Sequence, residues 1–328
     1  MSAFADALVL TGPTGAGKTA LALELADRLG AEVVAMDSMT LYRGMDVGTA
    51  KPTPAERARV RHHLIDVLDP WESANVAWWL DRAAAACGEI RGRGKRPLFV
   101  GGTPFYLMAV RHGLFPAPPA DELLRRRLEA EAEAAGRPAL HARLGAVDPR
   151  TAARLHPNDV RRVVRALEVY ELTGRPISSF QQTWDTPAFA GPRGAGGAGP
   201  APAPVPCVVL ELPRGELYAR IDRRVEAMLG AGWLDEARRL LALPRPPGRE
   251  AARALGYQEL FAHLAGNGPG WAETVSLIQT RTRQFAKRQL TWFRRLARCR
   301  TVPADRPDTA ARVTAAWAAD KDLRPAES

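Results

Sequence analysis

The sequence has few cysteines and no long apolar run. Its 328 residues include three cysteines, Cys87, Cys207 and Cys299, which lie far apart in the chain. Three isolated cysteines predict neither a disulfide framework nor a zinc site. The apolar runs are much shorter than the roughly 20 residues that a membrane span requires, so no membrane association is expected. The first residues lack a basic segment and a cleavage-type signal, and we therefore expect a cytoplasmic protein.

Acidic residues are also outnumbered. The chain carries 46 Lys and Arg against 36 Asp and Glu, a formal net charge of +10. A basic surplus attracts polyanions such as nucleic acids. Because alanine, arginine, glycine and proline are abundant throughout, part of this surplus reflects a general arginine bias. Charge alone therefore does not decide whether a nucleic acid is a partner.

A phosphate-binding motif stands near the start of the chain. Residues 12–19 fit the P-loop pattern G-x-x-x-x-G-K-[ST], between an apolar run at 7–10 and a helix-forming segment at 20–26. The glycines let main-chain amides converge on an anion at a helix N-terminus. The predicted phosphate-binding residues are Gly12, Pro13, Thr14, Gly15, Ala16, Gly17, Lys18 and Thr19. Lys18 adds a positive charge, and the Thr19 hydroxyl is a candidate Mg²⁺ ligand.

The order of apolar segments predicts an α/β fold, with a P-loop NTPase-like parallel sheet, helices on both faces and an inserted all-helical subdomain. Strands are expected at 7–10, 32–35, 97–102 and 207–212, with a short strand or edge segment at 63–67, and helices at 20–26, 74–91 and 103–110. Ligands of such sheets bind beyond the carboxyl ends of the strands. We therefore expect the P-loop, Asp37 with Ser38, and Gly101 to Thr103 to border one cleft.

Composition also suggests where the chain divides. We expect a P-loop core from residues 1–112 and 207–300, a helical insertion at 113–185, and a C-terminal tail at 301–328. Residues 186–206 are almost entirely glycine, proline and alanine, which predicts a flexible loop because they offer little apolar surface to bury. Within the insertion, residues 156–159 resemble a turn in which Asn158 or Asp159 caps the next helix.

A basic segment lies near the C-terminus. Residues 273–300 are predicted to form one helix, with an apolar face through Val275, Ile278, Thr282, Phe285, Gln289, Trp292 and Leu296. Eight cations decorate the remainder, against the single acid Glu273. Interleaved aromatic residues favour a surface for RNA or phosphate over a merely solvated basic face.

The acid that follows the second strand limits the chemistry. ATPases and GTPases usually place an aspartate at the end of an apolar Walker-B strand, whereas residues 97–100 are followed by Gly-Gly-Thr. Asp37 is instead placed to accept a proton or hydrogen bond from a nucleophile that attacks a phosphate-bearing donor. Two other roles stay open at this point, a helix cap and a group that supports bound Mg²⁺.

Longer motifs resemble the tRNA dimethylallyltransferases, also called tRNA isopentenyltransferases. The motifs lie in the order of that family at residues 37–52, 63–66, 69–70, 100–103, 156–159, 165–169, 217–224, 255–257 and 283–292. They span about residues 8–300. Two segments depart from the family pattern, Pro104-Phe105 and residues 186–206. Neither contains a polar catalytic position.

The resemblance implies a reaction and a set of roles. The family transfers a dimethylallyl group from dimethylallyl diphosphate to N6 of the adenosine just 3′ of certain tRNA anticodons. It implies that the P-loop holds the diphosphate with help from Arg220 and Arg224, that Thr19 binds Mg²⁺, and that the catalytic residues are Asp37 as general base, Thr103 at the bridging oxygen and Lys18. Growing charge on the leaving diphosphate fits such a site.

The resemblance also implies tRNA contacts and partners. The partners are the tRNA anticodon stem-loop and dimethylallyl diphosphate, and we expect a monomer. The predicted tRNA contacts come from both parts of the chain: Asp37, Ser38, Met39, Thr40, Thr103, Arg125, Arg161, Arg162, Val163, Val164, Arg165, Arg253, Gly256, Tyr257, Arg283, Gln284, Lys287 and Arg288. The target base must leave its stack, which is least costly in a single-stranded loop.

Three other functions are weighed against this one. A prenyltransferase of free adenine nucleotides would need neither the helical insertion nor the basic C-terminal helix. A small-molecule kinase would share the P-loop but not the long motifs. A non-catalytic RNA-binding NTPase would leave Asp37 and the Gly-Gly-Thr strand end without a task.

Overall fold

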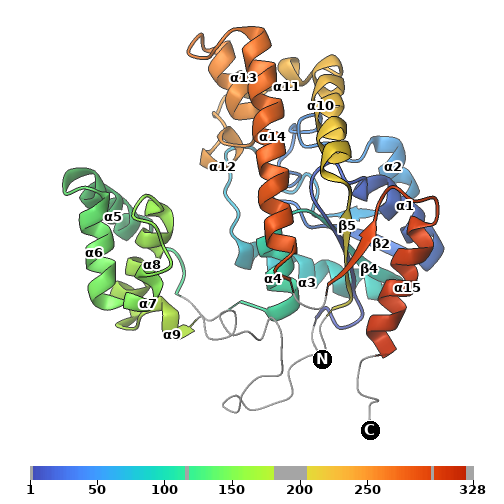
Figure 1. The fold of residues 1–328 in the computed structure, drawn as a ribbon, viewed down its shortest axis with the longest axis horizontal. Coiled ribbons are helices and arrows are strands. Elements are labelled where there is room, and N and C mark those ends of the chain that lie inside the picture. Colours follow the sequence, from blue (N-terminus) through green and yellow to red (C-terminus); the bar gives the residue numbers. More distant parts are fainter. Residues whose placement is uncertain (1–2, 115–117, 181–204, 297–298, 323–328) are drawn as a thin grey trace. The chain divides into compact units, whose positions relative to one another are not determined.

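The structure is a computed structural model that describes residues 3–114, 118–180, 205–296 and 299–322. The chain divides into two compact units, one formed by Met1–Arg111 with Ala198–Ser328 and the other by His112–Gly197. Figure 1 shows both units, and each is described here by itself. None of the helices within these ranges is long and apolar enough to cross a membrane.

The first unit is built on a six-stranded parallel sheet in the order β3-β2-β4-β1-β5-β6. Its strands are β1 (Leu8–Thr11), β2 (Ala31–Ala35), β3 (His62–His63), β4 (Arg96–Gly101), β5 (Cys207–Glu211) and β6 (Arg300–Pro303). The predicted fold class and the four main predicted strands are confirmed. β1 lies between β4 and β5, so the P-loop leaves the middle of the sheet.

Helices cover both faces of this sheet. On one face, α1 (Lys18–Leu29) and α15 (Thr309–Asp322) pack on Leu8, Leu10 and Val208. On the other face lie α3 (Val76–Gly92) and α4 (Pro104–His112), where the buried Trp79 packs edge-on against Phe99 of β4 and stacks on Tyr106 of α4. Alternate strand residues therefore enter different cores, as the pleat of a strand requires. The short α2 (Pro54–Arg59) follows a loop after β2.

The helices between β5 and β6 form the upper part of this unit in Figure 1. They are α10 (Arg214–Gly230), α11 (Trp233–Leu241), α12 (Arg249–Ala252), α13 (Tyr257–Leu264) and α14 (Trp271–Phe293). The prediction of a helix to Arg300 is wrong at its end, because α14 stops at Phe293. Its buried face runs through Thr274, Ile278, Ala286, Gln289 and Phe293, while Phe285 and Trp292 are 38% and 40% exposed. The prediction that Phe285 and Trp292 belong to the buried face of this helix is therefore wrong.

The C-terminal segment completes the sheet. The expectation of a tail from residue 301 is wrong for residues 301–322, which contain most of β6 and all of α15. Trp317 of α15 is 2% exposed, and its indole Nε1 donates a hydrogen bond to the Val9 carbonyl at 3.1 Å. The last helix is therefore anchored to the first strand. No local pattern indicated this contact, because the two residues lie 308 positions apart in the chain.

The second unit is helical where it is described. It contains α5 (Glu122–Ala134), α6 (Arg137–Val147), α7 (Pro149–Ala152), α8 (Val160–Thr173) and α9 (Ile177–Phe180). Its core includes Leu128, Leu144 and Leu167. Asp159 occupies the N-cap position of α8 but its side chain makes no capping hydrogen bond, so the predicted cap is wrong in that respect. The predicted loop at 186–206 lies outside the described residues except for 205 and 206.

Candidate active site

A cavity of about 730 Å³ lies at the carboxyl ends of β1, β2 and β4 in the first unit. The three strand ends expected to meet do border it, together with residues of α10 and α14. The predicted site residues that line it are Thr14, Gly15, Gly17, Lys18, Thr19, Asp37, Ser38, Met39, Thr40, Thr103, Arg224, Arg253, Tyr257, Gln284 and Arg288. A cavity of this size suits a small organic ligand together with part of a larger one.

The P-loop joins β1 to α1 by a turn that needs glycine. Gly12 has a φ of 150°, and a Cβ at this position would lie 2.8 Å from the Leu210 carbonyl oxygen. Gly17, at the N-cap of α1, has a φ of 82°. These two positions let the loop run close beside β5 and then enter the helix at Lys18. The loop amides and the N-terminus of α1 thus form a site for an anion.

Lys18 is folded back onto the P-loop. Its Nζ donates hydrogen bonds to the carbonyl oxygens of Gly12 and Pro13 at 2.9 and 2.8 Å. Burial, which is the largest cause, and the charge of Arg224 lower the pKa of Lys18 to about 8, although Asp37 acts in the opposite direction. An anion bound in the P-loop would favour the ammonium form and raise this pKa.

Arg224 of α10 reaches the same loop. Its Nη1 donates to the Thr14 hydroxyl at 3.3 Å, and burial lowers its pKa from the ordinary value. Arg220, one turn earlier, forms an ion pair with Glu216 at 2.6 Å and is not among the residues that line the cavity. Arg224 is therefore the better placed of the two predicted arginines to neutralise a ligand in the P-loop.

Asp37 and Thr103 face the cavity from neighbouring strand ends. The Asp37 Oδ1 accepts a hydrogen bond from the Met39 amide at 2.8 Å, which fixes the carboxylate. The Thr103 hydroxyl accepts from the Ser38 amide at 3.3 Å, and the Thr103 amide donates to the Met36 carbonyl. The second carboxylate oxygen of Asp37 makes no bond to the residues that the structure describes. It is the atom best placed to accept a proton from a ligand.

Gln289 of α14 joins two walls of the cavity. Its Oε1 accepts from the Thr14 amide at 2.9 Å, and its Nε2 donates to the Gly102 carbonyl at 2.6 Å. The side chain is 3% exposed, so the buried amide is satisfied at both ends. From the sequence, Gln289 was placed on a helix face and within the family motif at 283–292, without a role of its own. A polar residue on an otherwise apolar helix face was the signal that could have identified it.

Two family profiles match the chain. The profile described as IPP transferase matches residues 40–296, and the one described as Isopentenyl transferase matches residues 5–67. The tRNA dimethylallyltransferase of Symbiobacterium thermophilum is 49% identical over 308 residues, which cover 94% of this chain and 92% of that protein. The enzyme of the same name from Methylibium petroleiphilum is 49% identical over 320 residues, with coverage of 94% and 93%. This chain belongs to the IPP transferase family.

Solved structures agree with this assignment. The full-length tRNA isopentenylpyrophosphate transferase of Bacillus halodurans is 36% identical, with a TM-score of 0.67 and coverage of 97% of this chain and 99% of that one. A eukaryotic dimethylallyltransferase acting on tRNA is 26% identical, with a TM-score of 0.75 and coverage of 98% and 81%. The resemblance inferred from the sequence motifs is therefore confirmed, and the chain is an IPP transferase along nearly its whole length.

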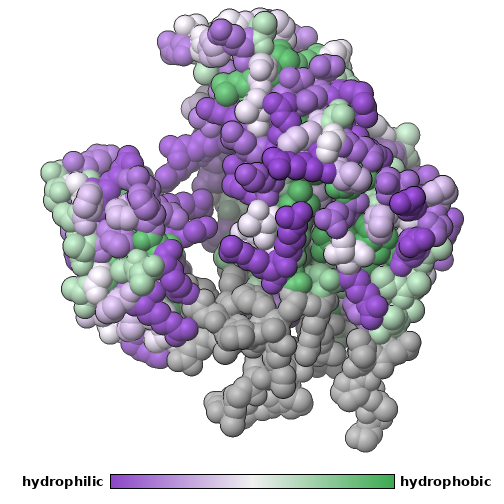
Figure 2. Space-filling view, viewed as in Figure 1, coloured by the Kyte–Doolittle hydropathy of each residue, from purple (hydrophilic) through white to green (hydrophobic). Residues whose placement is uncertain are grey.

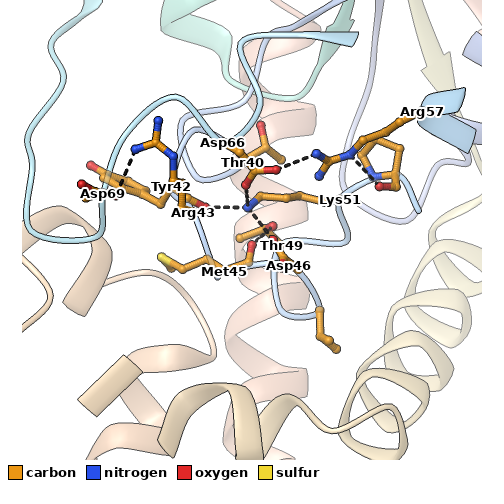
Figure 3. A network of polar contacts seen from close by, with 12 residues as sticks. Thr40, Tyr42, Arg43, Met45, Asp46, Thr49, Lys51, Arg57, Asp66 and Asp69 are labelled. Atoms are coloured by element: carbon orange, nitrogen blue, oxygen red, sulfur yellow. Dashed lines mark hydrogen bonds and ion pairs between the residues drawn. The ribbon is translucent and has the colours of Figure 1, made fainter. Parts of the chain in front are cut away.

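The loop after β2 of this IPP transferase is held by a buried lysine (Figure 3). The Lys51 side chain is 1% exposed, and its Nζ contacts the Tyr42 carbonyl and the carboxylates of Asp46 and Asp66 at 2.5 to 2.7 Å. Arg57 pairs with the other oxygen of Asp66. Every N–H of the lysine can thus find an acceptor. The segment from residue 37 to 51 is folded back on itself by this contact.

A buried carboxylate supports the same loop from α11. Glu236 accepts hydrogen bonds from the amides of Asp46, Val47 and Gly48 and from the Tyr257 hydroxyl. Tyr257 is fully buried, and Trp233 lies over both Gly48 and Gly256, so closely that a Cβ at either glycine would clash with its ring. Tyr257 and Gly256 were predicted as tRNA contacts. In the structure, the Tyr257 side chain is buried by packing, and the absence of a side chain at Gly256 makes room for the Trp233 ring.

The other predicted tRNA contacts of this unit differ in exposure. Arg253, Gln284, Lys287 and Arg288 are exposed, whereas Arg283 is paired with Asp222. α10 and α14 lie side by side in Figure 1, and the face over them in Figure 2 is mostly hydrophilic. The exposed cations thus extend from the cavity rim along α14.

The predicted contacts of the helical unit are not equally available. Arg125 and Arg165 both bind the carboxylate of Glu168, which is fully buried. The side chains of Val163 and Val164 belong to the core of this unit, so they support α8 and do not present a surface. Arg161 and Arg162 are exposed, and Arg162 also pairs with Asp159 at 3.2 Å. Any direct contact with RNA from this group would come mainly from Arg161 and Arg162.

Proposed function

We propose that this chain transfers a dimethylallyl group from dimethylallyl diphosphate to N6 of the adenosine immediately 3′ of the anticodon in tRNAs, and releases diphosphate. The observation that carries the proposal is the meeting of an anion-binding P-loop with the free carboxylate oxygen of Asp37 and the hydroxyl of Thr103 at one cavity. Family membership supplies the prenyl-transfer class. We retain a monomer as the expected state.

The diphosphate of the donor would occupy the P-loop. The amides at the start of α1 and the charges of Lys18 and Arg224 point to the same place. Negative charge grows on the diphosphate as its oxygen separates from the allylic carbon, so these groups stabilise the transition state more than the bound donor. Arg220 would add a more distant charge after release from Glu216.

Mg²⁺ is the expected cofactor, and the residues present fit it. Among the described residues no group of three or more acidic, histidine or cysteine side chains could hold a metal ion. The hydroxyl of Thr19, an exposed residue at the end of the P-loop, is the one protein ligand that we propose. Mg²⁺ is often held by one or two protein groups together with substrate phosphates and water. When bound, it would neutralise charge on the diphosphate.

The acceptor would be the exocyclic amine of adenine. The N6 nitrogen attacks the allylic C1, the C1–O bond to diphosphate breaks, and one N6 proton passes to the free oxygen of Asp37. Since N6 is a weak nucleophile and hardly basic, the carboxylate acts mainly as the new C–N bond forms. Thr103, held by the Ser38 and Met36 backbone, would contact the bridging oxygen of the donor.

The tRNA would present its adenosine as a base turned out of the anticodon loop, which costs a few kcal/mol. Residues 37–40, Arg253, Gln284 and Arg288 would contact it at the cavity, and Arg283 and Lys287 would add contacts along α14. We further propose that the helical unit binds the stem-loop through Arg161 and Arg162, with Arg125, Val163, Val164 and Arg165 holding that surface in shape. Water exclusion would protect the allylic centre.

Mass spectrometry of a suitable tRNA tests this function directly. The protein is incubated with Mg²⁺, dimethylallyl diphosphate and a tRNA that carries adenosines at and beside the position 3′ of the anticodon. Addition of one dimethylallyl group at that single adenosine is the expected result. Modification of AMP or ADP but not of tRNA would instead identify an adenine-nucleotide prenyltransferase. This acceptor is included because the Isopentenyl transferase profile matches residues 5–67. Consumption of ATP without prenylation would favour a small-molecule kinase.

A further inference from the structure

Two cysteines that lie 92 positions apart in the sequence are in contact. The Sγ atoms of Cys207 and Cys299 are 2.8 Å apart. Cys207 is the first residue of β5, and Cys299 comes immediately before β6. Val208 pairs with Arg300 in these parallel strands, so Cys207 and Cys299 stand opposite each other at the start of the pair. Their separation in the sequence predicted isolated cysteines, which is wrong for this pair.

The strand pair sets a spacing that a disulfide can bridge. Neighbouring strands lie about 4.8 Å apart, which is within the Cα separations of about 4.4–6.8 Å that disulfides span. The contact between the two Sγ atoms shows that both side chains already point toward each other. Oxidation would therefore require movement of side chains and little movement of the backbone.

The two sulfurs have unequal surroundings. Cys207 is fully buried, whereas Cys299 is partly exposed. Arg111 of α4 donates from its Nη1 to the Cys299 Sγ at 3.0 Å. The hydrogen bond with Cys207 and the charge of Arg111 lower the pKa of Cys299, while burial and the charge of Asp320 act in the opposite direction. Burial raises the pKa of Cys207. Cys299 is thus the nucleophile of the pair, and Cys207 is the resolving thiol beside it.

The third cysteine provides an internal comparison. Cys87 of α3 is fully buried, and burial raises its pKa to about 12. No cysteine lies next to it among the residues that the structure describes. It therefore has neither the thiolate character nor the partner that the other two possess.

We propose that Cys207 and Cys299 are an oxidation site, which forms a reversible intramolecular disulfide when the protein meets a hydroperoxide. The Cys299 thiolate attacks the peroxide, an S–O bond forms, the O–O bond breaks and the departing oxygen leaves as water after protonation. The Cys207 sulfur then displaces the hydroxyl of the Cys299 sulfenic acid, and its proton leaves with that hydroxyl as a second water. The two sulfurs lose two electrons and the peroxide gains them.

The bridge would close a loop that contains much of the proposed active site. Helices α10 to α14 all lie between the two cysteines, including Arg224 and Gln289. Cys207, Cys299 and Arg111 are not among the residues that line the cavity. A bond between two strands that already pair would leave the cavity open, and it would restrict the unfolded chain. We therefore expect an oxidised form that retains turnover and melts at a higher temperature.

Intact-mass spectrometry of the full chain tests the proposal. The reduced protein is treated with a small excess of hydrogen peroxide, and its mass is compared before and after addition of dithiothreitol. Loss of two hydrogen atoms, recovered on reduction, is the expected result, together with a joined Cys207–Cys299 peptide in a non-reducing digest. The same treatment is applied to Cys299→Ser, Cys207→Ser and Cys87→Ser.

The variants make the result specific. The mass loss should persist in Cys87→Ser and disappear in Cys299→Ser and Cys207→Ser, each checked for folding by its turnover. Cys299→Ser replaces a partly exposed side chain, so it keeps the test valid if Cys207→Ser fails to fold. Addition of oxygen at Cys299 without a bridge, a bridge that includes Cys87, or no change in mass under peroxide would each overturn the proposal.

Discussion

The carboxylate of Asp37 has one oxygen fixed by the Met39 amide and one that faces the cavity. Removal of its negative charge by Asp37→Asn should preserve the fixed hydrogen bond while it removes the proton acceptor. We expect kcat to fall by roughly 10²–10⁴-fold and the affinity for tRNA to change by less than about tenfold. Single-turnover rates and filter binding measure the two quantities. A kcat within tenfold of the parent would exclude Asp37 as the base.

The protonation of Lys18 should make the affinity for diphosphate depend on pH. Its folded-state pKa of about 8 lies below the value of 10.5 that an exposed lysine has, so the free protein loses this charge as pH rises through 8. Diphosphate binding favours the ammonium form, and near pH 8 the protein should take up a proton at Lys18 when inorganic diphosphate binds. The affinity should weaken as pH rises further, because more of the lysine must then be protonated.

Calorimetry in buffers of different ionisation enthalpy measures this proton uptake. Lys18→Arg is the matched control, since arginine stays protonated throughout this range and should bind without uptake at this position. The difference between the two proteins removes the contribution of the ligand's own titration. Equal uptake by the two proteins would show that Lys18 is already fully charged in the free state.

At the scale of elements, the loop between β2 and α2 depends on one buried ammonium group. Lys51→Met would remove three contacts at once and leave the Tyr42 carbonyl and the Asp46 carboxylate without this donor. Asp66 would lose one donor and keep its ion pair with Arg57. We expect a loss of about 2 kcal/mol in the free energy of unfolding, because Asp46 and Asp66 remain partly exposed and can be hydrated. Denaturant unfolding followed by circular dichroism measures it. The exposed Lys95→Met should change the free energy by less than about 0.5 kcal/mol.

Gln289 links α14 to the P-loop and to the end of β4. Gln289→Leu would leave the Thr14 amide and the Gly102 carbonyl unpaired, and we expect kcat/KM for dimethylallyl diphosphate to fall by roughly tenfold or more because the loop is no longer held. Binding of tRNA should change less. Gln279→Leu, on the same helix but outside the cavity lining, is the control. If Gln289 had a purely structural role, Gln289→Leu would instead lower the stability of the protein and weaken the use of dimethylallyl diphosphate and the binding of tRNA to the same extent.

Local patterns predicted the elements better than the contacts between them. The strands at β1, β2, β4 and β5 were predictable because each is a short apolar run, and the P-loop because its glycines and lysine have fixed spacing. The anchor of Trp317 on Val9, the bridge made by Gln289 and the contact of Cys207 with Cys299 were not. Each of them joins residues whose separation in the chain conceals their proximity, so a local pattern does not identify the partner. The polar Gln289 on a mostly apolar helix face marked that residue itself, but not the two groups that it binds.

The helical unit shows the same limit for the candidate site. Arg125 and Arg165 have the residue type of phosphate ligands, yet both are bound to Glu168. Val163 and Val164 belong to a family motif, but their side chains fill the core of the unit. Residue type and motif position identified the segment, whereas burial decides which of its side chains can meet a ligand.

For the whole molecule, the net charge of +10 should make tRNA binding depend on salt. Each phosphate contact contributes a slope of about −0.7 to −0.9 to log affinity against log salt concentration. Arg253→Gln and Arg288→Gln, at the cavity rim, should each reduce the slope by roughly that amount. Arg59 of α2 pairs with Asp27 of α1, and Arg59→Gln should leave the slope unchanged. Equal slopes for all three variants would mean that the rim arginines do not contact phosphates.

The position of β1 has a consequence for how the chain matures during synthesis. The strand that leads into the P-loop is synthesised before its neighbour β5, which begins at Cys207. It is also synthesised before Trp317, which binds its Val9 carbonyl. The P-loop residues are therefore synthesised well before the residues that support the strand in front of them. A nascent chain that carries the whole motif still lacks the later segments that border the site, so it can hold a phosphate-bearing ligand only after those segments have been made.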